Sequence, residues 1–524
     1  MATNSRLARI ARAYWPFLII VLIVGIFVGA FPSSAVSSKT VKVNLSLLGT
    51  SLSQKPGYTV AGYRCGPKIR QVPWSKYAPY CIPAWHGNNG GATYPGVSRN
   101  TITITYRSPN TAGASLLLKI FGSEIGTNAQ AIQTMKDYIH IFNHTFELYG
   151  RHVVLKPFSG KGDFVNELQG QGLEQAKEDA LTAKKLNAFA DVSLLSSTQI
   201  YDQYLAHEGI IAIGALAQPS WWFQDYAPFE YSPNPSCDTG VEAIAQSVGR
   251  SFAGLPAIFS TSPTMKKKTR VFGIIFPESP TYASCGNLLV RLLKQEFNVT
   301  VARRIEYSIS FSQESSEAQS AIAQMKASGV TTILCGCDPI FPWLFTLDAQ
   351  SQNYYPEWLA LDFEDIFTQI YVQSEWAHAI STGLLLPPET QQEAYKVFYN
   401  YYHKAPPSPQ FAEIYPALLL LFDGLQAAGP DLNPYTFEQG FFRLPDSLPG
   451  GNYGLWVFSK NRFTTPGDFD VLEWNTLAIS PQDNKPGTYI ACYNDRRFPL
   501  SVSGAKELPY HQQPDCPSTP VPKT

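Results

Sequence analysis

The sequence predicts an α/β protein in which two doubly wound parallel sheets form two lobes behind an N-terminal transmembrane helix. Three observations support this prediction. Apolar strands alternate with long amphipathic helices, which is typical of right-handed βαβ units and of a parallel sheet covered on both faces. The alternation begins again after a proline-rich break between Pro228 and Pro235, and an uncharged apolar run, Trp15–Phe31, follows three arginines.

The first block of alternation starts at Thr101–Tyr106, where threonine alternates with apolar residues in the period of two that is typical of a strand. Apolar residues then recur at helical spacing from Ile132 to Phe146, and a second helix is predicted over Glu174–Phe189 because its alanines share one face. The other strands predicted in this block are Val153–Phe158, Val192–Leu195 and Ile210–Ala215.

The second block repeats this pattern, and a third stretch follows it. Helices are predicted around Leu288–Leu293 and Ala318–Met325, the latter ended by Gly329. The predicted strands are Val271–Phe276, Val299–Ile305, Val330–Leu334 and Trp358–Leu361. The third stretch, Gln391–Pro434, contains long apolar helices such as Ala417–Leu425. Gly454–Phe458 and Phe469–Trp474 are predicted as closing strands, and the proline-rich chain beyond residue 480 as irregular.

These patterns divide the chain into seven segments. Residues 1–35 are a cytoplasmic stub and transmembrane anchor or a signal peptide, 36–97 a tether and disulfide-closed extension, 98–235 the first lobe, 236–387 the second lobe, 388–455 a return to the first lobe, 456–480 the closing strands of the second lobe, and 481–524 an irregular tail.

The N-terminal run predicts export of the bulk of the chain. Trp15–Phe31 is just long enough to cross a bilayer core, and Arg6, Arg9 and Arg12 before it keep the N-terminus cytoplasmic. The alternative is a cleavable signal peptide with Ser33-Ser34-Ala35 as its small-residue cleavage site. We favour a single-pass membrane protein with an extracytoplasmic bulk, with secretion after cleavage as the alternative.

Eight cysteines, an even number, fit an oxidising compartment and predict disulfide bonds. Cys65 with Cys81 and Cys492 with Cys516 are predicted as local pairs. At least one bridge is expected among Cys237, Cys285, Cys335 and Cys337. Cys335 and Cys337 are separated by one residue, so an internal bridge would close a strained ring, and each is expected to pair elsewhere or to be free.

Composition and motifs argue against several functional classes. The net charge of −1 and the pI near 6.7 provide no overall field that attracts nucleic acid or acidic lipid. The sequence contains no phosphate-binding loop and no nucleophile elbow, and His207-Glu208 lacks the second histidine of a metalloprotease helix. No cysteine pair has zinc-ligand spacing beside histidines. The sequence therefore predicts neither an enzyme nor a metal or other cofactor.

Polar residues follow the predicted strands, where open parallel sheets bind ligands. If the two blocks face each other, the loops after their strands converge on one cleft. Hydroxyl, amide, phenol and acid groups suit a small polar solute, with a positive group facing an acid. Ser-Ser-Thr and the aspartates are also common helix caps, which is the alternative reading of these loops. The candidate ligand-binding residues are Ser196, Ser197, Thr198, Gln218, Tyr282, Asp338 and Asp362.

Several stretches resemble the type I periplasmic binding proteins of the branched-chain amino acid class, in particular an actinobacterial group of ABC-transporter substrate-binding proteins. The resemblance covers about residues 65–480 and lies in the order of its parts rather than in one diagnostic motif. The stretches that carry it are Cys65–Trp74, Pro95–Ile104, Tyr149–Leu155, Ser196–Gln199, Glu208–Ile211, Gly329–Ile340 and Tyr354–Trp358.

The resemblance implies two lobes joined by three crossovers that close over a ligand. In the family, a serine and a threonine of the first lobe bind the ligand's carboxylate, and a tyrosine and an acid of the second lobe bind its other end. The tyrosine corresponds to Tyr282 and the acid to Asp362. The serine falls on Leu195, beside Ser196, and the threonine on Gln218. These two departures argue against an ordinary α-amino acid as the ligand.

The expected function is capture of a small solute, with an ABC permease as partner and a role in transport of the amino acid type. The alternative is a sensory ectodomain that acts through a partner membrane protein, because only about 14 residues precede the predicted anchor.

Overall fold

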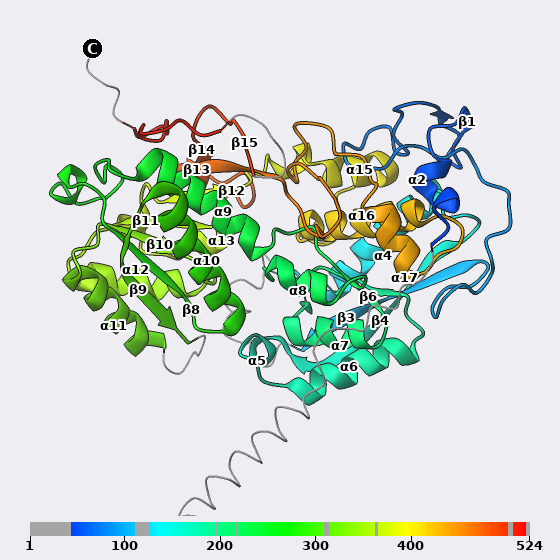
Figure 1. Ribbon diagram of the computed structural model, residues 1–524, viewed down its shortest axis with the longest axis horizontal. Coiled ribbons are helices and arrows are strands. Elements are labelled where there is room, and N and C mark those ends of the chain that lie inside the picture. The colour runs from blue at the N-terminus through cyan, green and yellow to red at the C-terminus, as the bar shows by residue number, and fades with distance from the viewer. Residues whose placement is uncertain are drawn as a thin grey trace, which may run out of the picture.

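The computed structural model describes residues 43–110, 126–193, 196–215, 217–308, 314–361, 365–500 and 507–519. The predicted anchor, Leu195 and Asp362 lie outside these residues. Two sheets with helices on both faces lie side by side in the described chain (Figure 1).

The first sheet has five strands, and every pair in it is parallel. Its spatial order is β4 (His152–Asp163), β3 (Thr101–Asn110), β5 (Ala190–Asp191), β6 (Ile211–Ile213) and β7 (Glu230–Tyr231). One face packs against α4 (Asn128–Thr145), α15 (Glu393–Tyr402), α16 (Phe411–Ala428) and α17 (Pro434–Phe441). α6 (Leu173–Lys185) and α7 (Gln199–His207) cover the other face, and α5 (Phe164–Leu168) and α8 (Ser220–Asp225) follow β4 and β6.

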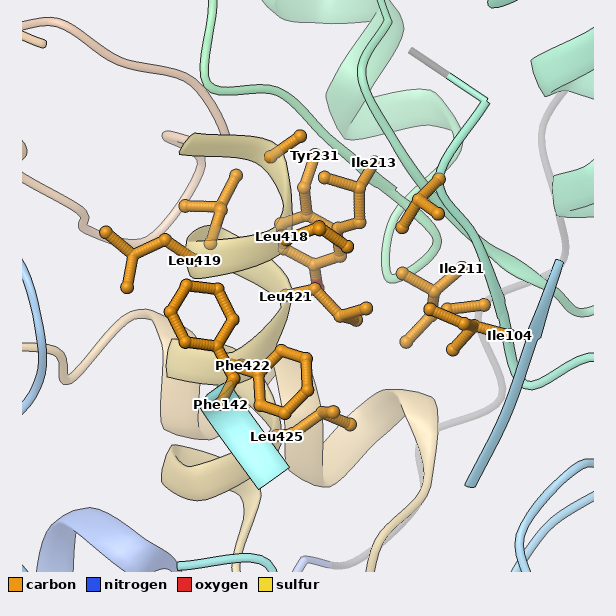
Figure 2. Packing of buried hydrophobic residues seen from close by; sticks show 14 of the residues in the cluster. Ile104, Phe142, Ile211, Ile213, Tyr231, Leu418, Leu419, Leu421, Phe422 and Leu425 are labelled. Atoms are coloured by element: carbon orange, nitrogen blue, oxygen red, sulfur yellow. The ribbon is translucent and has the colours of Figure 1, made fainter. Parts of the chain in front are cut away.

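The core of this lobe is centred on α16, which is mostly apolar and is buried continuously from Ile414 to Ala428. Figure 2 shows Leu418, Leu421 and Leu425 of α16 packed toward Ile104 and Ile211 of the sheet. Among the described helices, only α16 is both long enough and apolar enough to cross a membrane. However, 89% of it is buried inside the protein. Burial on all sides explains its composition, because a helix surrounded by protein needs no polar face.

The second sheet is mixed. Its order is β14 (Pro486–Ala491), β13 (Asp468–Ile479), β12 (Ile380–Gly383), β11 (Glu357–Leu361), β10 (Thr332–Cys335), β8 (Phe272–Pro277) and β9 (Val301–Tyr307), with β15 (Phe498–Pro499) paired to β13. The strands from β12 to β9 are parallel, and β13 is antiparallel to its neighbours. α9 (Cys237–Ser247) and α10 (Pro280–Phe297) pack on one face. The other face packs against α11 (Glu314–Ala327), α12 (Phe341–Ser351) and α14 (Gln373–Trp376), with α13 (Asp365–Thr368) beside β14.

The described chain crosses between the two sheets three times, after β7, after β12 and after α17. This connectivity agrees with the predicted two-lobed α/β fold. Short helical turns complete the described elements: η1 (Leu45–Leu47), η3 (Val248–Phe252), η4 (Met265–Lys267) and η5 (Glu389–Gln391).

Three predictions of secondary structure were wrong. Gly454–Phe458 forms no strand, because side chains rather than a neighbouring strand accept its backbone amides, as Asp468 does for Leu455 at 2.6 Å. The chain beyond residue 480 is not irregular throughout, since β14 and β15 pair with β13. The strand expected from Val192 lies instead at Ala190–Asp191, and the Asp191 carboxylate accepts the Ser193 amide at 2.9 Å where the chain turns.

The N-terminal extension, residues 43–97, packs on the first lobe. It contains α2 (Gly49–Leu52) and the two-stranded β1 (Gly57–Tyr58) and β2 (Arg64–Cys65). The buried Arg151 guanidinium donates to the carbonyls of Ser98 and Asn89 in and beside the extension and to that of Pro430. One buried cation thus joins three chain segments that are far apart in sequence.

All eight cysteines are paired. Cys65–Cys81 and Cys492–Cys516 are confirmed as local pairs, and Cys237–Cys285 supplies the bridge expected in the second block. The prediction for Cys335 and Cys337 was wrong, because these two residues pair with each other. The chain bends after β10 and brings their Cα atoms to 5.0 Å, a separation that a disulfide spans.

Candidate functional site

The loop after β5 presents Ser196, Ser197 and Thr198, and all three side chains are buried and hydrogen-bonded within the protein. The Ser196 hydroxyl donates to the Arg107 carbonyl at 2.6 Å. The Ser197 hydroxyl donates to the carboxylate of Asp202. Thr198 is the N-cap of α7, accepting from the Tyr201 amide at 3.3 Å while it donates to Glu167. The capping alternative therefore holds for Thr198, and direct contact of this loop with a ligand stays a prediction.

The buried side chain of Arg107 holds the Ser196–Thr198 loop in place. The Arg107 guanidinium donates to both carboxylate oxygens of Glu167, at 2.9 and 3.1 Å, and to the Ser196 carbonyl. It also lies 3.8 Å from the centre of the Tyr201 ring, so the cation is desolvated and enclosed. Sequence reasoning ended this strand at Tyr106 and therefore missed Arg107, which lies in the longer β3 (Thr101–Asn110) near its carboxyl end.

The loop after β6 joins the two sheets. The Gln218 carbonyl accepts a hydrogen bond from the Cys237 amide at 3.1 Å, and the Ser220 amide donates to Asp238. Cys237 begins α9, whose Gly240 lies so close to Leu361 at the end of β11 that a Cβ there would come within 2.9 Å of Cδ2. The carboxyl end of β6 therefore lies beside the carboxyl end of β11, as a shared cleft requires.

A disulfide extends this junction to Tyr282. Cys237 is bonded to Cys285, which lies one helical turn after Tyr282 in α10. Tyr282 is half-buried, and burial, together with the charge of Asp338, raises its pKa to about 12. The Cys237–Cys285 disulfide thus connects the loop that carries Gln218 in the first lobe with the helix that carries Tyr282 in the second.

Asp338 follows β10 and is held in a fixed orientation. One carboxylate oxygen, Oδ1, accepts from the amides of Ile340 and Phe341 at 2.8 and 3.2 Å. The other, Oδ2, accepts from the Tyr307 hydroxyl at 2.6 Å. Burial raises the pKa of Asp338 despite these donors. A partly exposed carboxylate with three donors in place can still accept one more hydrogen bond, so it suits a hydrogen-bond donor or a cation from a ligand.

Two tyrosines near Asp338 were missed from the sequence. Tyr307 ends β9, and Tyr371 donates to the Pro339 carbonyl at 2.5 Å. The charge of Asp338 contributes to raising the pKa of both hydroxyls, after the larger effect of burial. A tyrosine at the end of a strand was the available signal for Tyr307, since the predicted strand stopped only two residues before it.

Two of the pockets in the described part of the protein bear on the position of the site. One lies at the ends of β3 and β4 and is lined by polar residues that include Asn110, Lys161 and Gln175. The other lies between the extension and α16, and none of its lining residues follows a strand of either large sheet, so it has no part in the candidate site.

Neither the described side chains nor the comparisons with known sequences identify a metal site or a family for this chain. Among the described residues, no group of three or more His, Cys, Asp or Glu side chains could hold a metal ion. No family model matches the chain, and no curated protein matches its sequence.

Solved structures do match. The leucine-, isoleucine-, valine-, threonine- and alanine-binding protein of Brucella ovis, in a closed conformation, aligns with 76% of this chain and 95% of its own at 12% identity and a TM-score of 0.53. An ABC-transporter solute-binding protein of Rhodopseudomonas palustris BisB5, in complex with 3,4-dihydroxybenzoic acid, aligns with 76% of this chain and 97% of its own at 8% identity and a TM-score of 0.50. A periplasmic binding protein type 1 of Bordetella pertussis Tohama I covers 76% of this chain and 99% of its own at 14% identity and a TM-score of 0.49.

At these identities the first two matches establish the fold. The chain has the two-lobed α/β fold of the type I periplasmic binding proteins, in agreement with the resemblance seen in the sequence.

Proposed function

We propose that this chain is an extracytoplasmic solute-binding protein that captures a small polar organic solute between its lobes and delivers it to an ABC importer. The observation that carries this proposal is the junction of Gln218 with Cys237. It joins the loop after β6 of the first sheet to the start of α9 in the second lobe, in a fold whose solved members include solute-binding proteins of ABC transporters. The chain binds the solute and releases it without chemical change.

Each lobe has a distinct role in this proposal. Tyr282 and Asp338 form the second-lobe side, where the phenol and the carboxylate meet a donor or a cationic group of the solute. Gln218 and the Ser196–Thr198 loop form the first-lobe side. Because the three hydroxyls of that loop donate within the protein, the loop offers a solute its fixed backbone in this conformation rather than free side chains.

Capture requires the lobes to close. The three crossovers are the segments that absorb such a hinge motion, since each passes once between two packed lobes. Titration calorimetry is the direct test once a solute has been found by incubating the purified protein with metabolite pools and identifying what is retained by mass spectrometry. The released compound should have an unchanged mass.

Two substitutions test the site itself. Asp338→Asn keeps an oxygen for the two backbone amides but removes the charge, and Tyr282→Phe removes only a hydroxyl. Each should weaken binding of a cationic solute about ten- to a hundred-fold, the value of one hydrogen bond to a charged group in a closed site. Tyr399→Phe, on an exposed face of α15, is the matched control. Wild-type affinity in both site variants would remove the second-lobe assignment.

We also propose that Trp15–Phe31 anchors the chain in the cell membrane with its bulk outside. The protein should then fractionate with membranes, and protease added to intact spheroplasts should degrade the bulk. Recovery of soluble protein that begins near Val36 would show a cleaved signal instead.

A further inference from the structure

The chain has a strongly uneven distribution of charge. No Asp or Glu occurs before Glu124, yet 13 of the 40 Lys and Arg residues lie in this stretch. The other 401 residues carry 27 cations against 41 acids. The net charge of −1 therefore hides a basic N-terminal region on an acidic body. Arg6, Arg9 and Arg12 precede the proposed anchor and Arg107 is buried against Glu167, so the cations of the extension itself are the ones that an outside partner can meet.

The described extension concentrates this charge beside exposed aromatic rings. Tyr58, Tyr63 and Trp74 are 67%, 37% and 43% exposed, although aromatic side chains of this size are usually covered. The exposed cations Lys55, Arg64 and Lys68 lie among them. These six residues are called the extension patch.

The six side chains share one local surface. Tyr58 and Arg64 are register partners in the β1–β2 ribbon, and the rings of Tyr63 and Trp74 meet edge to face at 5.6 Å between centroids. The Lys68 amide donates to Gln54, the residue before Lys55, at 3.0 Å. No ion pair found among the described residues includes Lys55, Arg64 or Lys68. The cations are thus available to an outside partner.

The patch is rigid and lies at an end of the molecule. Cys65–Cys81 closes the ribbon, and the Gln426 amide group donates to the Tyr80 carbonyl at 3.2 Å, which ties the extension to α16. In Figure 1, β1 lies at the outer edge of the first lobe, on the side away from the second sheet. A surface at this edge can contact a flat partner without covering the junction between the sheets.

If Trp15–Phe31 anchors the chain as proposed above, the sequence also limits how far this patch can be from a membrane. Val43 follows the apolar run Trp15–Phe31 by only 12 residues, which span at most about 40 Å when fully extended. Tyr and Trp rings are favoured at the headgroup level of a bilayer, and Lys and Arg are attracted to anionic headgroups.

We infer that the extension patch docks on the surface of a bilayer that contains anionic lipids, with its three rings at headgroup level and its three cations on the lipid phosphates. Docking there holds the ectodomain in one orientation and leaves the ends of both sheets open to solute. This inference does not depend on which solute binds.

Hydrogen exchange on the full-length chain tests it. The protein is reconstituted into vesicles of phosphatidylcholine alone or of phosphatidylcholine mixed with phosphatidylglycerol, and exchange is read by mass spectrometry on peptides that cover residues 55–74. Exchange should slow at least ten-fold in the anionic vesicles only, and high salt should abolish the protection.

The matched variants reverse the same number of charges in two places. Lys55→Glu/Arg64→Glu/Lys68→Glu should lose the protection, because three cations contribute about a hundred-fold in partitioning, roughly five-fold each. Lys266→Glu/Lys267→Glu/Lys268→Glu reverses an exposed lysine cluster of the other lobe, and this variant should keep the protection against exchange. Equal exchange in both lipids, or loss of protection in both variants, would overturn the inference, and the first result would point to a protein partner for the patch. Solute affinity in solution should be the same in both variants, so failure of this inference is distinct from failure of the proposed function.

Discussion

The Tyr307 hydroxyl donates a hydrogen bond to Oδ2 of Asp338 at 2.6 Å and accepts one from the Asp338 amide at 3.0 Å. One phenol thus fixes both the side chain and the backbone of the acid assigned to the solute. Tyr282, by contrast, interacts with the same acid through its charge. The two tyrosines should therefore have different roles, one in holding the site and one in binding.

Tyr307→Phe should destabilise the protein without solute by about 1–3 kcal/mol, because a buried amide and a carboxylate oxygen lose their partner. Tyr282→Phe should leave this stability almost unchanged and weaken only solute binding. Chemical denaturation of the two variants, followed by titration calorimetry, separates the roles. Equal destabilisation by both changes would contradict the distinction.

Arg107→Met should destabilise the first lobe by about 3–5 kcal/mol, because it leaves the buried carboxylate of Glu167 without its cation. Thermal unfolding measures this loss. Lys161→Met breaks the exposed ion pair with Glu178 and serves as the control, with little measurable change expected. A similarly small effect of Arg107→Met would show that the cation does not hold the Ser196–Thr198 loop.

Stability should fall as the pH rises from about 4 to 7. Burial raises the pKa of Asp202 from 3.8 to about 7, so in this range the folded state retains a proton that the unfolded chain has lost. The cost is on the order of 3 kcal/mol at the upper end of the range. Burial also raises the pKa of Glu230, whose two carboxylate oxygens accept no hydrogen bond from any residue that the structure describes. This group therefore also makes stability fall as the pH rises.

Asp202→Asn should reduce this slope, because its amide oxygen can still accept from Ser197 while the titrating group is gone. Denaturation at a series of pH values compares it with Glu174→Gln, an exposed change in the first turn of α6. A slope that Asp202→Asn leaves intact would assign the pH dependence to other groups.

Much of the fold could be predicted because buried parallel strands have a strong apolar signature. Thr332–Cys335 of β10 is buried on both faces, and its predicted range, Val330–Leu334, is displaced by only one or two residues. β14 was missed because its Pro-Gly start reads as a turn, and the strand forms only where β13 supplies a partner. Its existence depends on a contact that the local sequence does not contain.

Some residues of the candidate site could also be predicted from the sequence, and others could not. Tyr282 and Asp338 could be selected because each follows a strand, and the structure places them in electrostatic contact. Tyr307 was missed although it lies just past a predicted strand, because its contact with Asp338, 31 residues away in sequence, depends on the strand order β10-β8-β9. Arg107 was missed because the strand continued past the last residue of clear alternation.

A disulfide that encloses a longer stretch of chain should contribute more to stability, with a gain that grows as the logarithm of the enclosed length. Cys65 and Cys81 are 16 residues apart, and their replacement by alanine should cost about 3 kcal/mol through the greater freedom of the unfolded chain. Cys335 and Cys337 are only 2 residues apart, so Cys335→Ser/Cys337→Ser should cost less stability. Non-reducing peptide mapping first checks the four pairs, and denaturation of each double variant then ranks them. A larger loss for the Cys335 and Cys337 pair would show that this bridge acts on the folded loop that carries Asp338 rather than on the unfolded chain.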